Sequence, residues 1–357
     1  MPCSSASRLP DSVFGTASRA SPVRKRSSPM RFRRTRKTAV GAVWLHAIRR
    51  DQGSVGPSRR SVGARRSGSL QAARCNSAGG EGVQQEQIEA HAEDRSELAS
   101  DEPASAASRR LRLLTYNVRH CRGTDGRVAP ERVARVIAAL APDIVALQEV
   151  DVGRPRTDGL DQAEEIARLV GMFSHFHPAL HIEEERYGDA VLTHLPSRLK
   201  RAGPLPGLLR RPGLEPRGAL WVEVTAGASK LQVITTHFGL LGAERVAQAK
   251  ALLGPDWLGD PACHAPTVLL GDFNAMGWSR AYRRLSGRLT DARRLTGDRR
   301  WRRGGATFPS RFPLLRVDHV FVSERVAVER IAVVDTPLAR KASDHLPVLA
   351  EIRIEPG

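Results

Sequence analysis

The sequence predicts an α/β domain with mixed β-sheets over residues 109–357. Two observations predict this class. From residue 111 onward, short runs with the two-residue period of β-strands recur along the chain, and amphipathic patterns with the 3.6-residue period of helices lie between them. Strands and helices do not alternate strictly, and strands do not occur alone. The sheets are therefore expected to be mixed.

The first half of this domain contains two predicted strands and two predicted helices. Residues 111–118 and 144–150 read as strands because each is an apolar run of strand length. Between them, Pro130 opens a helix whose apolar residues recur at helical spacing. Asp161 is placed to cap a second helix, which ends at Gly171. Both helices carry a single apolar stripe.

The second half contains more predicted strands and one further predicted helix. That helix covers about residues 243–253 and stops at Gly254 and Pro255. We find no internal repeat strong enough to indicate a repeat architecture. The predicted strands of this half are residues 189–195, 218–225, 231–238, 267–272, 316–323, 328–335 and 347–354.

Residues 1–108 are predicted to form a disordered basic extension and an acidic linker. The first 80 of the 357 residues include 17 Lys and Arg but only 2 Asp and Glu, so most of the net charge of +18 lies there. The segment is rich in Ser, Gly, Arg and Ala, lacks hydrophobic periodicity and cannot bury a core. A basic run precedes the apolar residues 39–48, which leaves a targeting sequence open. Upstream sequence from a misassigned start codon is a further alternative.

The chain carries no sequence signal for a membrane span or a cysteine-based site. No run approaches the ~18–20 apolar residues that a transmembrane helix needs. The four cysteines include no CxxC pair, so neither a disulfide framework nor a zinc site is predicted. We expect a cytoplasmic monomer.

A carboxylate, amide or imidazole stands at one end of six predicted strands. Each of these residues alone fits an ordinary turn, a cap or a solvated side chain. Asp318 is less ordinary, because it shares a strand face with Val320 and Val322 and a buried carboxylate needs a partner. Several such ends together favour one convergent site. The residues are Asn117, Glu149, His237, Asp272 with Asn274, Asp318, and Asp344 with His345.

The chemistry of this set indicates a hard cation and phosphoryl chemistry. Carboxylate and carboxamide oxygens suit Mg²⁺ or Mn²⁺, and the set contains no cysteine ligand and no HExxH motif. Histidines with carboxylate neighbours suit acid/base work or the stabilisation of an anion. A hard metal beside imidazole would polarise phosphoryl oxygens and stabilise the charge that develops on them.

Six short motifs occur in order along the domain: TYN (115–117), LQE (147–149), TH (236–237), GDFN (271–274), VDH (317–319) and SDH (343–345). In this order they resemble the endonuclease/exonuclease/phosphatase (DNase I-like) superfamily in its short bacterial form. The resemblance covers about residues 111–355 and does not fix a substrate. It implies a four-layer α-β-β-α sandwich of two packed mixed sheets. It also implies an enzyme that hydrolyses a phosphoester by in-line attack of a metal-activated water.

The resemblance implies a site for a divalent cation, Mg²⁺ or Mn²⁺. Glu149 would be the principal ligand, and Asn117 would be a second ligand. Asp344 would lie near the metal, with a water between them as one arrangement.

The resemblance also implies catalytic roles for five residues. Asp272 would orient or deprotonate the attacking water, or protonate the leaving oxygen. Asn274 would hydrogen-bond the phosphate or the nucleophile. His345 would contact the phosphate and stabilise its developing charge, and Asp318 would hold and polarise His345. His237 would be a second imidazole at the phosphate.

Two positions depart from the superfamily pattern or leave it open. Asp189 stands in YGDAVLT (187–193) where the superfamily usually has Asn. Asn can donate a hydrogen bond to a phosphate oxygen, whereas ionised Asp cannot, so Asp189 would repel phosphate, recruit a second cation or be protonated. Arg154 or Arg156 stands where short bacterial members carry an arginine that reaches the phosphate, and a plain exposed loop arginine is the alternative.

The substrate stays open between nucleic acid, a phospholipid headgroup, and inositol phosphate or another small phosphate, with a nuclease-type phosphodiesterase slightly favoured. Two Arg-rich stretches, 198–217 and 293–305 with Trp301, fit nucleic acid, anionic lipid or mere surface composition. A non-catalytic phosphate-binding scaffold is an alternative from another class. The full set of metal and acid/base residues argues against it, because a binding module needs no base beside its metal.

Overall fold

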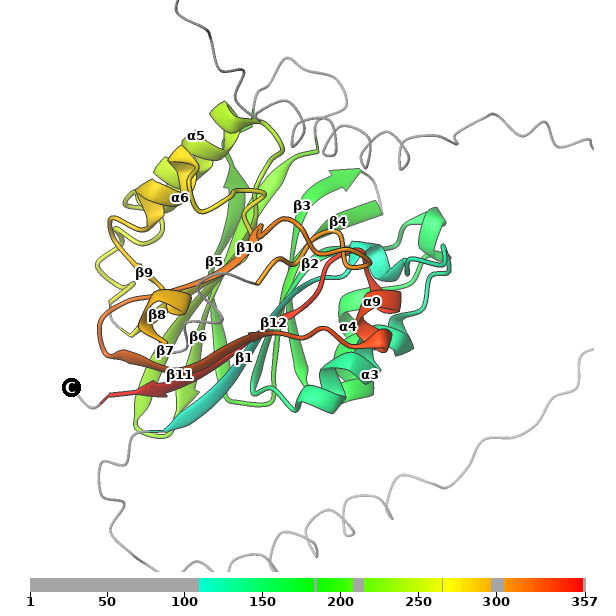
Figure 1. Cartoon of the computed structure of the whole chain (residues 1–357), viewed down its shortest axis with the longest axis horizontal. Coiled ribbons are helices and arrows are strands. Elements are labelled where there is room, and N and C mark those ends of the chain that lie inside the picture. The colour runs from blue at the N-terminus through cyan, green and yellow to red at the C-terminus, as the bar shows by residue number, and fades with distance from the viewer. Residues whose placement is uncertain (1–108, 183–184, 208–214, 265, 297–304, 356–357) are drawn as a thin grey trace, which may run out of the picture. The chain divides into compact units, whose positions relative to one another are not determined.

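The described part of the chain is one layered α/β domain (Figure 1). The predicted extension of residues 1–108 lies outside the described residues, and so do residues 297–304 with Trp301. No helix in the described part is long and apolar enough to cross a membrane. The computed structural model describes residues 109–182, 185–207, 215–264, 266–296 and 305–355.

Two six-stranded sheets form the centre of the domain. The first has the order β11-β12-β1-β2-β4-β3, and the second has the order β5-β6-β7-β8-β10-β9. One pair in each sheet is parallel, β1 with β2 and β7 with β8, and the other neighbours are antiparallel, so both sheets are mixed as predicted. The strands are β1 (Arg110–Asn117), β2 (Ile144–Val152), β3 (Phe173–Ile182), β4 (Glu185–Thr193), β5 (Ser197–Leu205), β6 (Arg217–Ala226), β7 (Ser229–His237), β8 (Thr267–Asp272), β9 (Thr290–Asp291), β10 (Asp318–Val322), β11 (Val326–Val333) and β12 (Val348–Ile354).

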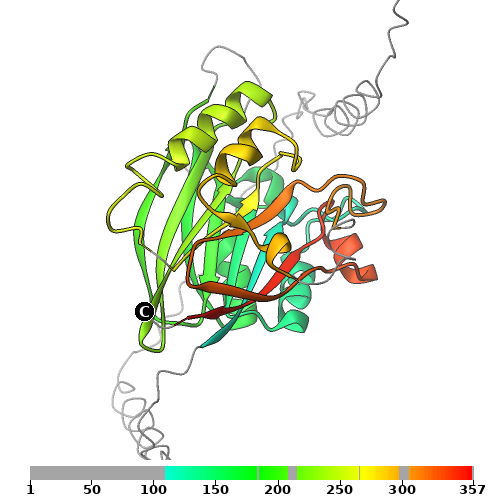
Figure 2. The same ribbon diagram turned by 60° about the vertical axis from the view of Figure 1, so that its left-hand side comes forward.

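Helices cover the outer face of each sheet. Helices α3, α4 and α9 pack on the first sheet, and α5 and α6 pack on the second, which gives the four layers that the resemblance implies (Figures 1 and 2). Two short 3₁₀ turns, Arg119–Cys121 and Pro155–Thr157, follow β1 and β2. The helices are α3 (Pro130–Leu140), α4 (Gln162–Val170), α5 (Gly242–Leu252), α6 (Arg280–Leu285), α7 (Ala292–Leu295) and α9 (Pro337–Ala342).

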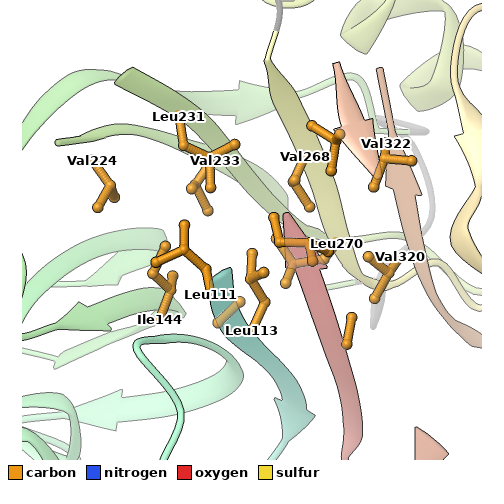
Figure 3. Packing of buried hydrophobic residues seen from close by; sticks show 14 of the residues in the cluster. Leu111, Leu113, Ile144, Val224, Leu231, Val233, Val268, Leu270, Val320 and Val322 are labelled. Atoms are coloured by element: carbon orange, nitrogen blue, oxygen red, sulfur yellow. The ribbon is translucent and has the colours of Figure 1, made fainter. Parts of the chain in front are cut away.

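The main core lies between the two sheets and is built from their inward-facing aliphatic residues (Figure 3). Leu113 and Ile144 of the first sheet are buried with Val233, Leu270 and Val320 of the second. Each such side chain stabilises the fold by about 1.5–3 kcal/mol through burial. This packing holds the two sheets face to face, so the strand ends at one edge keep fixed positions relative to each other.

The sequence prediction missed three edge strands: the two-residue β9 and the longer β3 and β5. Strand β3 contains Pro178, which interrupts a strand pattern and lies at the bulge between Pro178 and Leu180. Strand β5 overlaps the stretch 198–217, which was interpreted as an Arg-rich segment for nucleic acid, anionic lipid or mere surface composition and not as a strand. Both are edge strands, and charged residues or proline at an edge protect it against further pairing while they hide the period.

Candidate active site

Strand pairing brings the predicted polar residues to one edge of the sandwich. Asn117 is the last residue of β1, His237 of β7 and Asp272 of β8. In the second sheet, Asp272 stands beside His237 on the parallel side and beside Asp318 on the antiparallel side. The predicted convergence of strand ends is thus present in the fold.

Gly271 makes the exit from β8 possible. Its φ of +147° and its packing against the backbone of Thr236 exclude a side chain, because an added Cβ would collide with the carbonyl oxygen of Thr236. Asp272, which follows, is buried, and its carboxylate receives the backbone N–H of Asn274 at 2.8 Å.

Asp272 is the centre of the polar cluster. Asn117 Nδ2 donates to its Oδ2 at 3.0 Å. The same Oδ2 lies 3.4 Å from His237 Nε2 and 3.7 Å from His345 Nε2. Burial, and next the carboxylate of Asp318, raise the pKa of Asp272 to about 6, while His345 opposes the rise.

His345 is hydrogen-bonded to Asp318. The ring Nδ1 donates to Asp318 Oδ2 at 3.0 Å, and the ring of Phe308 packs 4.8 Å from the imidazole centre. Burial alone would lower the pKa of His345, but the carboxylates of Asp318 and Asp272 outweigh it and raise the pKa to about 10. His345 is therefore a buried imidazolium whose Nε2–H is directed toward the Asp272 side.

His237 has the opposite protonation state to His345. Asn274 Nδ2 donates to His237 Nε2 at 3.0 Å and to the carbonyl of Phe238 at 2.8 Å, so both amide hydrogens of Asn274 are engaged within the protein. Burial, then the charges of Arg217 and His345, lower the pKa of His237 well below its usual value. Its ring is neutral, with Nε2 as the acceptor.

Glu149 completes the cluster from the first sheet. Asn117 Nδ2 donates to Glu149 Oε1 at 2.9 Å. Burial, and next the charges of Glu215 and Asp344, raise the pKa of Glu149 to about 7. The side chain is still 23% exposed, so solvent reaches the carboxylate.

The donor set fits a hard divalent cation. One ligand atom each from Glu149, His237 and Asp272 lies within 4.8 Å of the others. Carboxylates whose pKa values are raised by burial and mutual repulsion are stabilised by an added cation. The amide of Asn117 directs Nδ2 to the carboxylates while Oδ1 accepts from Arg119 N at 3.1 Å, and a half-turn of the amide would present Oδ1 to an ion instead.

Backbone strain concentrates at this edge. Of the eight non-glycine residues with positive φ in the described part, Glu149 lies at the bulge in β2, Asn274 follows β8, and three form the turn Arg119–Cys121 directly after β1. Such conformations cost about 1–3 kcal/mol each and occur preferentially at functional sites.

Asp344 lies at the rim of the cluster. Its carboxylate is 3.4 Å from Arg119 Nε and 28% exposed. The loop before it is fixed because Ser343 Oγ donates to the carbonyl of Asn117 at 2.8 Å and Ser310 N donates to the carbonyl of Asp344 at 2.6 Å.

Asp189 is buried in β4 beside the cluster. Burial raises its pKa to about 8, Arg217 opposes the shift, and Glu149 and Asp272 add to it. Of the three predicted alternatives for Asp189, this pKa agrees with the protonated carboxyl near neutral pH.

The two candidate phosphate-reaching arginines are both engaged in ion pairs. Arg156 binds Asp151 through two hydrogen bonds of 2.6 and 2.8 Å, and Arg154 donates to Glu185 at 3.2 Å. Both guanidiniums lie over the ring of Tyr187, at 5.4 and 6.0 Å from its centre.

The sequence analysis missed Arg217, which is buried at the start of β6. Arg217 pairs with Glu215 at 3.0 Å and interacts with the hydroxyl of Tyr187, and its charge lowers the pKa of both Asp189 and His237. It stands in the Arg-rich stretch 198–217, and the sequence offers no signal that separates Arg217 from the other arginines there.

A two-sheet sandwich with amide, carboxylate and imidazole groups gathered at its strand ends defines the class of DNase I-like phosphoesterases. A profile of the Endonuclease/Exonuclease/phosphatase family matches residues 114–345. The chain belongs to this family, whose members are phosphoester hydrolases.

Three comparisons illustrate the similarity. An uncharacterized Escherichia coli K12 protein, YbhP, is 33% identical over 147 residues, which are 40% of this chain and 54% of that protein, so the match spans about half of the relative. An endonuclease/exonuclease/phosphatase structure from Beutenbergia cavernae has a TM-score of 0.58 and 26% identity, and the match covers 69% of this chain and 72% of that one. The mannosyl-6-phosphatase Bt3783 of Bacteroides thetaiotaomicron has a TM-score of 0.54 and 20% identity, with coverage of 68% and 99%, and shares the fold.

Proposed function

We propose that the domain hydrolyses a phosphoester with Mg²⁺ or Mn²⁺ bound at Glu149 and Asn117. The observation that carries this proposal is the buried cluster in which Asp272 lies between the imidazolium of His345 and the amide of Asn117. When bound, the cation would polarise the phosphoryl oxygens and neutralise part of their charge. Asp344, at the rim, is placed to hold a water of such an ion.

The protein's own groups divide the remaining work. Asp272 is the base that orients the attacking water and accepts its proton, because its pKa of about 6 leaves it ionised at neutral pH. His345, held by Asp318, donates from Nε2 to a phosphoryl oxygen and stabilises the charge that grows there. Asn274 fixes the carboxylate of Asp272 through its backbone N–H and the neutral ring of His237 through Nδ2, so the acceptor Nε2 of His237 helps to position the cluster and does not donate to the phosphate.

A non-catalytic phosphate scaffold explains this arrangement less well. An anion-binding site gains from Arg and Lys side chains, whereas Glu149, Asp272 and Asp318 add three carboxylates to this site. The carboxylates are explained by a cation and a base. We therefore assign the chain a hydrolytic activity of the phosphodiesterase or nuclease type, acting as a monomer.

One observation favours phospholipid headgroups as a second candidate substrate. Phe312 and Leu314 are 76% and 66% exposed. They lie on the loop that carries Phe308, which packs on His345, and Ser310, which bonds to Asp344. Exposed apolar side chains beside a site fit a lipid surface, and an aromatic side chain there also fits an unstacked base.

The experiment uses the full chain, stripped of metal, with the generic phosphodiester bis-p-nitrophenyl phosphate. We expect turnover after addition of Mg²⁺ or Mn²⁺ and its loss on addition of EDTA. A screen against plasmid DNA, single-stranded DNA, sphingomyelin and inositol phosphates then separates the substrate classes. Turnover that EDTA leaves unchanged would contradict the metal assignment, and no turnover of any substrate would favour the scaffold.

A further inference from the structure

An arginine-lined cleft of about 450 Å³ lies outside the proposed active site. It opens where α6, α7 and the segment before β10 meet. It contains three guanidinium groups and one carboxylate. Its lining residues are Tyr282, Asp291, Arg293, Arg294 and Arg316.

The single carboxylate, Asp291, is already fully used. Tyr282 Oη donates to it at 2.6 Å, the backbone N–H of Arg293 donates at 3.0 Å, and Arg316 forms an ion pair with it. Burial would raise the pKa of Asp291, but Arg316 and next His319 outweigh it and lower the pKa. Asp291 thus pairs with Arg316 and is the single carboxylate among the residues that line the cleft.

Two further guanidiniums, those of Arg293 and Arg294, line the cleft. The guanidinium of Arg293 packs against Gly305, and burial together with the charge of Arg316 lowers the pKa of Arg293 to about 10. Arg294 is exposed, its guanidinium lies 5.8 Å from the ring centre of Tyr282, and it forms no ion pair with a carboxylate of the described residues. Clustered guanidiniums in a partly enclosed cleft are stabilised by an anion that accepts several N–H bonds, as phosphate does.

The cleft lies beside β10, and its lining residue Arg316 comes just before the start of that strand. Arg316 precedes Asp318 by two residues, a distance of at most ~7 Å along an extended chain. Asp318 turns to His345, while the next residue, His319, turns to the other side and donates from Nε2 to the carbonyl of Ala275 at 2.7 Å. The lining residue Arg316 is therefore close along the chain to Asp318, the residue that holds His345.

We propose that this cleft binds a second phosphate group, one that the active site does not cleave. We assign this second phosphate to the substrate, and this assignment rests on the proposed function. The substrate is then a chain of several phosphodiesters. A free phosphate that binds without being part of the substrate is the other source of the same chemistry.

The test compares Arg294→Ala with the matched control Arg283→Ala, an exposed arginine of α6 that does not line the cleft. With a single-stranded oligonucleotide, Arg294→Ala should lower kcat/KM about tenfold through KM, the scale of one charge-assisted contact. With bis-p-nitrophenyl phosphate, which has one phosphate, the variant should have the same kcat/KM as the wild type. Arg283→Ala should leave kcat/KM unchanged for both substrates.

A calorimetric titration with pyrophosphate, in metal-free buffer, distinguishes the outcomes. Weaker pyrophosphate binding by Arg294→Ala with unchanged oligonucleotide cleavage would assign the cleft to free phosphate. Equal pyrophosphate binding and equal cleavage by wild type and variant would overturn the proposal. If the wild type hydrolyses nothing, the proposed function fails, and the titration still decides whether the cleft binds phosphate.

Discussion

Two histidines face the same carboxylate of Asp272 and have opposite protonation. Asp318 lies behind His345 and keeps it charged, whereas Asn274 donates to His237, and burial, with the nearby cations, keeps His237 neutral. The two rings approach Asp272 Oδ2 at 3.7 and 3.4 Å. The groups around each ring, rather than the residue type, therefore determine its role. His345 is a charged hydrogen-bond donor, and His237 is a neutral acceptor held in position.

The largest effect is expected from removal of the charged ring. His345→Ala should lower kcat for bis-p-nitrophenyl phosphate at least ~10²-fold, because a preorganised cation is lost where negative charge develops. Asp272→Ala should lower kcat by at least the same ~10²-fold through loss of the base. Steady-state kinetics measure both, with circular dichroism to show that the fold is kept. Near wild-type turnover in both variants would mean that the site is elsewhere.

A smaller effect is expected from the neutral ring. His237→Gln keeps an acceptor near Asn274 and removes no charge, so kcat/KM should fall only about tenfold, the scale of one hydrogen bond of ~1–1.5 kcal/mol. The same assay compares it with His345→Ala. A loss from His237→Gln as large as that from His345→Ala would remove the distinction between the two sides.

The smallest effect at neutral pH is expected from Asp189→Asn. With a pKa of about 8, Asp189 is protonated at neutral pH and ionises above it, whereas Asn stays a neutral donor at every pH. Activity should match the wild type within about twofold near pH 7, and the variant should be faster above pH 8, as a pH–rate profile would measure.

The melting temperature gives Asp189→Asn a second readout. In the unfolded chain, the carboxyl of Asp189 is ionised at any pH above its usual pKa of 3.8. In the folded protein, the same carboxyl stays protonated up to about pH 8. The wild type therefore loses stability as the pH rises between these values. The variant should melt higher than the wild type near pH 8, with the difference smaller near pH 4. A variant that melts lower than the wild type near pH 8 would contradict a protonated Asp189 in the fold.

The active-site edge could be predicted from the sequence because strand ends carry their own signal. Buried runs such as 267–270 lead directly into Gly271 and Asp272, and an apolar run that ends in paired polar residues is visible without a structure. The order of such strand ends along the chain was sufficient to predict the family and the four-layer architecture.

Features that depend on contacts between distant segments could not be predicted. Edge strands β3 and β5 have only one neighbour, so charge and proline obscure their period. Arg217 is identified by its burial and its contact with Tyr187, which the sequence does not show. The different protonation of His237 and His345 depends on partners 37 and 27 residues away along the chain.

The most direct test of the two-histidine account is the ¹⁵N chemical shifts of both imidazoles in metal-free protein at about pH 8, a pH at which an unperturbed histidine is neutral. His345→Gln and His237→Gln assign the signals. We predict that His345 has both ring nitrogens protonated and that His237 has a bare Nε2. Asp318→Asn should lower the pKa of His345 from about 10 toward its usual 6.5. A neutral His345 beside a charged His237 would contradict the account.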